Sequence, residues 1–134
     1  MTCLEANPLN QITEKIIGAF FAVHSRLGPG FLEKVYENAL AIELSKAGLK
    51  SEQQKPVKVF YREQIVGEFF ADVLVEEKIL VELKAVKNLA DAHFAQCLNY
   101  LKATKLPVGF LVNFGEASVK FKRLINPELR ITIK

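Results

Sequence analysis

Apolar residues recur every three or four positions in three segments of the chain, and this spacing predicts three helices. The first begins near residue 10 and ends before Gly28-Pro29-Gly30, because two glycines and a proline do not continue a helix. The second covers about residues 31–46 and ends at a C-terminal glycine, Gly48. The third covers about residues 90–103.

After Gly48 the apolar period changes from 3.6 to 2, which is typical of strands. Leu129–Ile133 is either one more strand or a frayed tail. The resulting order, ααβββαββ, predicts an α/β (α+β) domain with a mixed central sheet flanked by helices. The predicted strands are the segment with Val57, Val59 and Tyr61, then Ile65–Val75, Lys78–Val86, Val108–Asn113 and Val119–Ile125.

The length of 134 residues predicts a single domain over residues 1–134, able to bury roughly 65–70% of the surface of the unfolded chain. No apolar run approaches the roughly 20 residues that span a membrane, and the N-terminus has no signal-peptide pattern. The two cysteines, Cys3 and Cys97, do not have a metal-ligand spacing, and Cys97 is predicted to be a buried free thiol. These observations favour a reducing, cytoplasmic location.

Positive charge is concentrated at the C-terminal end of the chain. Residues 1–100 carry 11 basic and 13 acidic side chains, a net of −2, whereas residues 101–134 carry 7 and 2, a net of +5. A basic end of this kind can follow phosphate groups. The alternative is that Lys120, Lys122 and Arg123 are ordinary solvated strand positions.

The candidate chemistry lies in two neighbouring predicted strands. Side chains alternate along a strand, so Glu82 and Lys84 share one face, and the turn at Glu76-Glu77 brings Asp72 alongside them. Two adjacent carboxylates repel unless a cation lies between them, and oxygen ligands suit Mg²⁺ or Mn²⁺. The alternative is a cross-strand ion pair of Glu82 and Lys84 on a solvated face.

Other polar residues are candidates for parts of this site. Gln96 and Tyr100 are four residues apart and share a helix face, where they could bond a phosphate or order a carboxylate, or simply form a helix edge. Glu33 lies in the first turn of the second helix, where its charge either belongs to the site or only compensates the helix dipole. His24 falls on an apolar face and is interpreted as a core residue.

The segment 23–36 resembles the signature of the GxxExxY proteins, which here reads Gly30, Glu33 and Tyr36. The resemblance covers about residues 10–126. It extends through Ala71-Asp72, Glu82-Leu83-Lys84, Ala95-Gln96 with Asn99-Tyr100-Leu101, and Gly109–Gly115. That family is grouped with the PD-(D/E)XK nuclease-like superfamily, so the resemblance implies a restriction-endonuclease-like core.

The resemblance also implies a role for each motif residue. Asp72, Glu82 and the backbone carbonyl of Leu83 would bind Mg²⁺ or Mn²⁺, with Glu33 completing the ligand shell directly or through water. Lys84 would polarise the attacking water, and Gln96 and Tyr100 would hold the site or the substrate phosphate, as in RecB-type members. The superfamily motif has a proline directly before its first aspartate, whereas this chain has Ala71 before Asp72.

These roles imply a metal-dependent nuclease acting on nucleic acid, with DNA favoured over RNA. The alternatives are a catalytically silent nucleic-acid-binding module and a homodimeric interaction domain on the same fold. An intact set of Asp72, Glu82 and Lys84 argues against loss of turnover. Because the chain is small, we expect a homodimer to be the form that binds a duplex.

Overall fold

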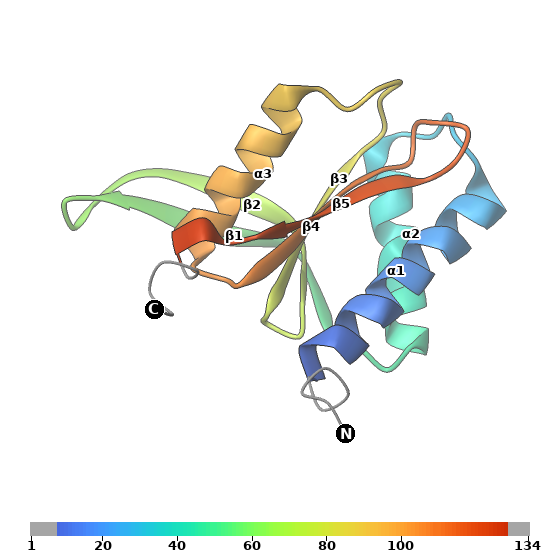
Figure 1. Ribbon diagram of the computed structural model, residues 1–134, viewed down its shortest axis with the longest axis horizontal. Helices are drawn as coiled ribbons and strands as arrows, with labels where there is room; N and C mark the ends of the chain where they lie inside the picture. The colour runs from blue at the N-terminus through green and yellow to red at the C-terminus, as the bar shows by residue number, and fades with distance from the viewer. Residues whose placement is uncertain (1–7, 129–134) are drawn as a thin grey trace.

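The computed structural model describes residues 8–128. Its order of elements and its mixed sheet flanked by helices confirm the predicted fold class (Figure 1). Within the described residues no helix is both long enough and apolar enough to span a bilayer. The elements are α1 (Pro8–Leu27), α2 (Glu33–Lys46), β1 (Ser51–Tyr61), β2 (Gln64–Val75), β3 (Ile79–Lys84), α3 (Asp91–Thr104), β4 (Val108–Asn113) and β5 (Lys120–Ile125).

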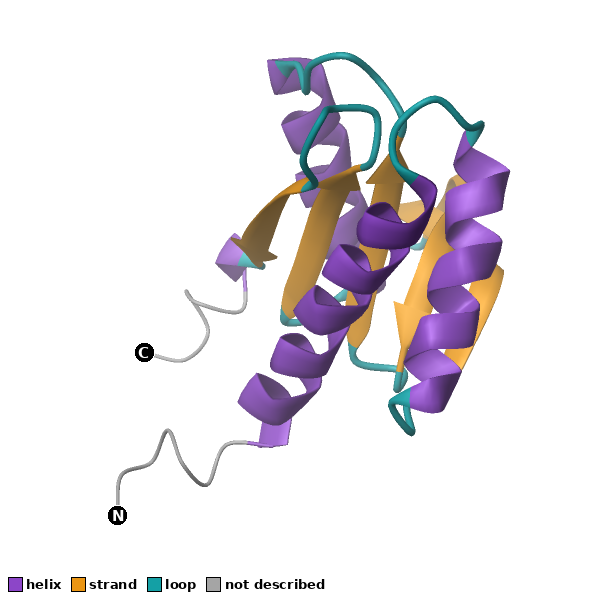
Figure 2. Cartoon of the chain, turned by 90° about the vertical axis from the view of Figure 1, so that its right-hand side faces the viewer, coloured by secondary structure: helices purple, strands orange, loops and turns teal. Residues whose placement is uncertain are grey.

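The five strands lie in the sheet in their sequence order, β1-β2-β3-β4-β5. β3 and β4 are parallel and every other neighbouring pair is antiparallel. A parallel pair needs a crossover connection, and α3 supplies it. Helices α1 and α2 cover one face of the sheet and α3 lies on the other, while the β1–β2 hairpin reaches out beyond the helices (Figures 1 and 2).

β3 and β4 are buried on both faces, which explains why their sequences are almost continuously apolar. Ile79, Val81 and Leu83 join the larger core beneath α1 and α2. Leu80 points to the opposite face and packs with Leu101 of α3 in a second, smaller core. Glu82, the residue between Val81 and Leu83, therefore faces the α3 side of the sheet.

Tyr36 stabilises the connection between α1 and α2 through hydrogen bonds to its backbone. Gly28 and Gly30 adopt positive φ angles of 65° and 114°, which favour glycine. The Tyr36 hydroxyl donates a hydrogen bond to the Gly28 carbonyl and accepts one from the backbone N–H of Phe31. Its ring stacks on Phe114, with centroids 4.8 Å apart. The tyrosine of the predicted signature thus fixes the end of α1 and the start of α2.

His24 and Cys97 are both core residues, as interpreted from the sequence. His24 Nε2 lies 2.8 Å from the backbone carbonyl of Glu116, and its ring stacks on Phe114. Cys97 is buried and carries a free thiol.

The first strand is longer than its apolar alternation predicts. β1 begins at Ser51, although regular alternation starts only near Val57. Residues 52–54 are polar and exposed, and Glu52 and Gln53 pair with β2 through backbone atoms that leave no apolar pattern in the sequence. The possible strand Leu129–Ile133 lies outside the described residues.

Candidate metal centre

Asp72 of β2 and Glu82 of β3 face each other where these two strands separate. The last residues in register are Val73 and Val81. Beyond them the Asp72 backbone N–H donates to Glu82 Oε2 at 3.0 Å, and the Leu83 backbone N–H donates to Asp72 Oδ2 at 2.8 Å. Each strand therefore binds the carboxylate of the other, and we call Asp72 and Glu82 the carboxylate pair.

Burial dominates the electrostatics of the carboxylate pair. Glu82 is only 5% exposed. Burial, and next the charge of Asp72, raise the pKa of Glu82 to about 9. The backbone N–H of Asp72 and the charge of Lys84 act in the opposite direction and offset only part of this increase. The pair is thus a place where negative charge is unfavourable until a cation compensates it.

The donor atoms of the carboxylate pair fit a hard divalent cation. Within the described residues Glu82 Oε1 accepts no hydrogen bond, and no fully buried side-chain oxygen there lacks a partner, so this atom contacts solvent. Residues 8–128 contain no group of three or more His, Cys, Asp or Glu side chains that could hold one ion. Mg²⁺ commonly uses one or two carboxylates and keeps several waters, which is the arrangement that this pair allows.

Lys84 follows Glu82 on the same face of β3 and does not form the ordinary ion pair that the sequence left open. Its Nζ lies 3.5 Å from Gln96 Oε1 of α3, a long hydrogen bond. Both ion pairs among the described residues lie elsewhere in the fold. The ammonium group is therefore near the carboxylate pair without being neutralised by it.

Tyr100 lies one turn beyond Gln96 and stacks on Phe69 of β2, with ring centroids 3.7 Å apart. Burial, and then the charges of Glu82 and Asp72, raise the pKa of Tyr100. The hydroxyl is therefore within the electric field of the carboxylate pair. The structure brings Lys84, Gln96 and Tyr100 to the same side of the sheet as Asp72 and Glu82.

The predicted role of Glu33 as a ligand, directly or through water, stays a prediction. Glu33 is exposed in the first turn of α2, and no hydrogen bond among the described residues joins it to the pair. The carboxylate that α2 turns toward the sheet is Glu37, one turn later and 4% exposed. β1 contacts α2 at its second turn, where Gln54 donates to Glu37 and also reaches Asp72.

The last residue of β4 and the two residues after it contact the segment that follows Lys84. The Asn113 side chain accepts from the Val86 backbone N–H at 3.0 Å and donates to the Val86 carbonyl at 2.9 Å, and the Phe114 N–H donates to the Lys84 carbonyl. A Cβ on Gly115 would lie 2.3 Å from the Val86 carbonyl oxygen, so only glycine fits. Asn113, Phe114 and Gly115 all lie within the motif Gly109–Gly115, but no pattern in the sequence indicated this role.

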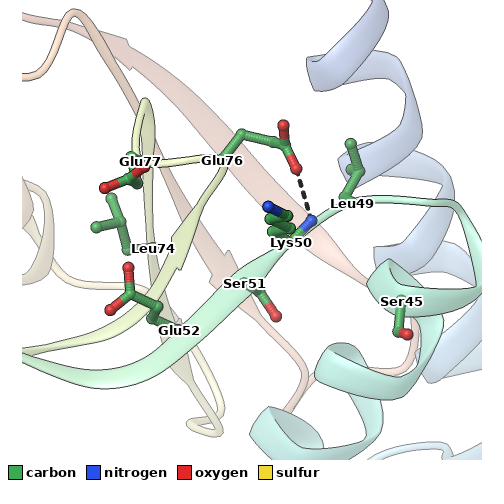
Figure 3. Close-up of a pocket in the computed structure, with 8 residues that line it drawn as sticks. All are labelled: Ser45, Leu49, Lys50, Ser51, Glu52, Leu74, Glu76 and Glu77. Carbon is green, nitrogen blue, oxygen red and sulfur yellow. Dashed lines mark hydrogen bonds between the residues drawn. The ribbon is translucent and has the colours of Figure 1, made fainter.

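A second acidic region lies at the turn between β2 and β3. Its hollow, of about 610 Å³, contains Glu52, Glu76 and Glu77, and we call it the acidic hollow (Figure 3). Glu76 Oε2 accepts from the Lys50 backbone N–H at 2.6 Å, and Glu52 forms an ion pair with Lys55 at 3.2 Å. No residue of the carboxylate pair lines this hollow.

Comparison with known proteins gives a family assignment. The model of the PD-(D/E)XK nuclease superfamily matches residues 10–124. No curated protein matches the chain. The crystal structure of SSO0001 has a similar fold, with a TM-score of 0.52 and 17% sequence identity; the match covers 71% of this chain and 50% of that one. The narrower resemblance to GxxExxY proteins stays a prediction. The chain belongs to the PD-(D/E)XK nuclease superfamily.

Proposed function

We propose that this protein is a divalent-metal-dependent nuclease that hydrolyses phosphodiester bonds, with DNA as the favoured substrate over RNA. The observation that carries the proposal is the carboxylate pair, in which Glu82 is buried and each carboxylate accepts a backbone hydrogen bond, from Asp72 or from Leu83. Nucleases of this superfamily generally use divalent metals, and the oxygen donors of the pair suit Mg²⁺ or Mn²⁺.

Each residue of the site has its own role in the proposed reaction. Asp72 and Glu82, with the backbone carbonyl of Leu83, would hold the ion. A divalent ion bound there lowers the pKa of a bound water and offsets charge on the phosphate. Lys84 would stabilise the charge that develops on the phosphate, because its ammonium group is not engaged in an ion pair. Gln96 and Tyr100 would bind or orient the substrate phosphate.

The distribution of lysines supports a nucleic-acid substrate. Across the sheet, Lys84 of β3 is in register with Asn113 of β4, which is in register with Lys120 of β5. Alternation along β5 places Lys122 on the same face as Lys120. A row of cations two strands from the carboxylate pair could follow the phosphates of a bound strand, and its affinity should fall steeply with salt.

The test is Mn²⁺- or Mg²⁺-dependent cleavage of single-stranded, duplex and branched DNA, and of RNA. We compare the wild type with Asp72→Asn, and use Glu76→Gln in the acidic hollow as the matched control. Cleavage by the wild type and by Glu76→Gln, but not by Asp72→Asn, is expected. Binding without cleavage by the wild type would favour the silent nucleic-acid-binding module, and equal cleavage by all three proteins would exclude this site.

We further infer that the protein acts as a homodimer of single domains in the cytoplasm. Leu32 at the N-cap of α2 and Ile42 within this helix are large apolar residues that are 81% and 62% exposed. Exposed apolar residues can take part in a protein interface. The mass in solution, measured for the wild type and for Ile42→Glu, tests this part: the variant should be monomeric if α2 forms the interface.

A further inference from the structure

Gln54 interrupts β1 directly beside the carboxylate pair. Gln53 is in register with Val73 and Lys55 with Ala71, and the ladder is broken between them at Gln54 and Asp72. Gln54 has a φ of 55°, the left-handed conformation that side chains other than glycine rarely adopt. This conformation costs roughly 1–2 kcal/mol in a residue with a side chain, so its presence in the middle of a strand calls for compensation.

The compensation comes from two carboxylates on different elements. Gln54 Nε2 lies 2.8 Å from Glu37 Oε1 of α2 and 3.4 Å from Asp72 Oδ1 of β2. An amide oxygen in the same place would meet carboxylate oxygens on both sides, so the amide nitrogen must occupy it. The left-handed backbone thus turns the side chain from β1 into the space between α2 and β2.

This contact completes the set of partners around Asp72. Oδ2 accepts from the Leu83 backbone N–H, and Oδ1 accepts the longer bond from Gln54. The rotation of the carboxylate is therefore restricted from two different strands. Partners that hold a metal-binding carboxylate in this way commonly change metal affinity although they do not touch the metal.

The neighbouring glutamine provides a matched contrast. Gln53 Nε2 donates to Glu37 Oε2 at 2.7 Å and to Asn38 Oδ1 at 2.8 Å, both on α2. It ties β1 to α2 as firmly as Gln54 does, but it makes no hydrogen bond to Asp72 within residues 8–128. Gln53 and Gln54 differ in one respect that matters here, which is contact with the carboxylate pair.

We infer that Gln54 is a positioning residue, which orients Asp72 for a divalent cation and links Glu37 of α2 to the carboxylate pair. The inference rests on the proposed function, because it assigns Gln54 to the metal centre of the proposed nuclease. If Gln54 were only a structural tie between β1 and α2, removing Gln53 would have the same effect as removing Gln54.

The first measurement is Mn²⁺ affinity by calorimetry for the wild type, Gln54→Ala, Gln53→Ala and Gln54→Gly. Gln54→Ala should raise the Kd for Mn²⁺ about 10-fold, whereas Gln53→Ala should leave it within about 2-fold of the wild type. Gln54→Gly relieves the left-handed conformation and so guards against a variant that fails to fold. It should lose Mn²⁺ affinity as Gln54→Ala does. Equal Kd values for the variants at positions 53 and 54 would overturn the inference.

The second measurement needs no metal and separates this inference from the proposed function. In EDTA, the melting temperatures of Gln54→Ala, Asp72→Ala and the double variant form a cycle. The loss in the double variant should be smaller than the sum of the single losses by about 2 °C or more. The matching cycle with Gln53→Ala should be additive. A wild type that binds no Mn²⁺ would refute the proposed metal centre, and additivity in the Gln54 cycle would refute the link to Asp72.

Discussion

The carboxylate pair and the acidic hollow lie at opposite ends of β3, and they differ in how their negative charge is compensated. In the hollow, Glu76 has a backbone N–H and Glu52 has a lysine ion pair, and both residues remain in contact with solvent. In the pair, Glu82 is buried against Asp72 and its pKa is raised to about 9. The hollow has more carboxylates, yet only the pair would gain strongly from a bound cation.

The comparison shows that the number of acidic residues is a poor guide to a metal site. In the carboxylate pair, Glu82 is buried away from water without forming an ion pair with any described residue, yet one of its carboxylate oxygens still contacts solvent. Substitutions matched between the two regions can therefore test the distinction directly.

The largest difference in cleavage rate is expected between variants of Lys84 and a variant of Lys50, a lysine that lines the acidic hollow. Lys84→Ala should reduce the cleavage rate by about 10²–10³-fold, because it removes a charge that stabilises the transition state. Mn²⁺ affinity and DNA affinity should stay nearly unchanged. Lys84→Arg should restore only part of the rate, since a planar guanidinium does not replace a compact ammonium group.

Lys50→Ala is the control and should cleave at the wild-type rate. Single-turnover cleavage with all four proteins purified in parallel measures the effect. Equal rates in Lys84→Ala and the wild type would indicate a contaminating nuclease or another site.

The segment after Lys84 gives the largest expected effect on stability. Gly115→Ala places a Cβ against the Val86 carbonyl and should lower the free energy of unfolding by about 3 kcal/mol. Gly67→Ala, in the exposed part of β2, is the control because no atom lies within 4 Å of its Cβ position. Urea denaturation of the three proteins measures the difference, and equal midpoints would mean that the close approach at Gly115 does not exist in solution.

Replacing Glu82 should stabilise the metal-free protein, and more so as the pH rises. Between pH 4.5 and about 9 the folded protein keeps a proton on Glu82 that the unfolded chain releases. Its free energy of unfolding therefore falls with pH across this range, by up to about 1.4 kcal/mol per unit. Glu82→Gln removes this loss and should melt about 5 °C or more above the wild type at pH 8 in EDTA.

Glu77→Gln in the acidic hollow is the matched control and should follow the wild-type melting curve from pH 5 to 9. Millimolar Mn²⁺ should then raise the melting temperature of the wild type and of Glu77→Gln, but not that of Glu82→Gln. Parallel pH curves for Glu82→Gln and the wild type would show that the carboxyl of Glu82 is solvated.

The last prediction concerns Cys97, a core residue that is close enough to the carboxylate pair to be affected by its charge. Burial, followed by the charges of Glu82 and Asp72, raises the pKa of this thiol from 9.0 to about 12. At pH 8 its alkylation by iodoacetamide should be at least about 10-fold slower in the native protein than in urea. Peptide mapping separates Cys97 from Cys3, and rapid native labelling of Cys97 would contradict the burial described here.

The fold and the neighbourhood of Asp72 and Glu82 could be predicted from the sequence because both depend on regular periodicity. The turn at Glu76-Glu77 sets the register of the β2–β3 hairpin, and alternation then decides which side chains face each other. The same reasoning placed Lys84 beside Glu82, although not its long hydrogen bond to Gln96.

Gln54 and Glu37 could not be predicted in this way. A left-handed residue in the middle of a strand is usually glycine, and Gln54 has no sequence signal for that conformation. Glu33 and Glu37 lie one helical turn apart on the same side of α2, so periodicity cannot choose between them. The choice depends on which turn of α2 meets β1, a tertiary contact that leaves no local pattern.

The sheet is open, and its two outer strands differ from the inner ones in a way that concerns self-association during folding. On β1, Pro56 offers no N–H and the register shifts after Val59. On β5, the exposed cations Lys120, Lys122 and Arg123 repel a second copy of themselves. An incoming strand therefore meets an interrupted row of backbone groups on β1 and like charges on β5, so molecules that collide while refolding at high concentration should separate again instead of growing into fibrils.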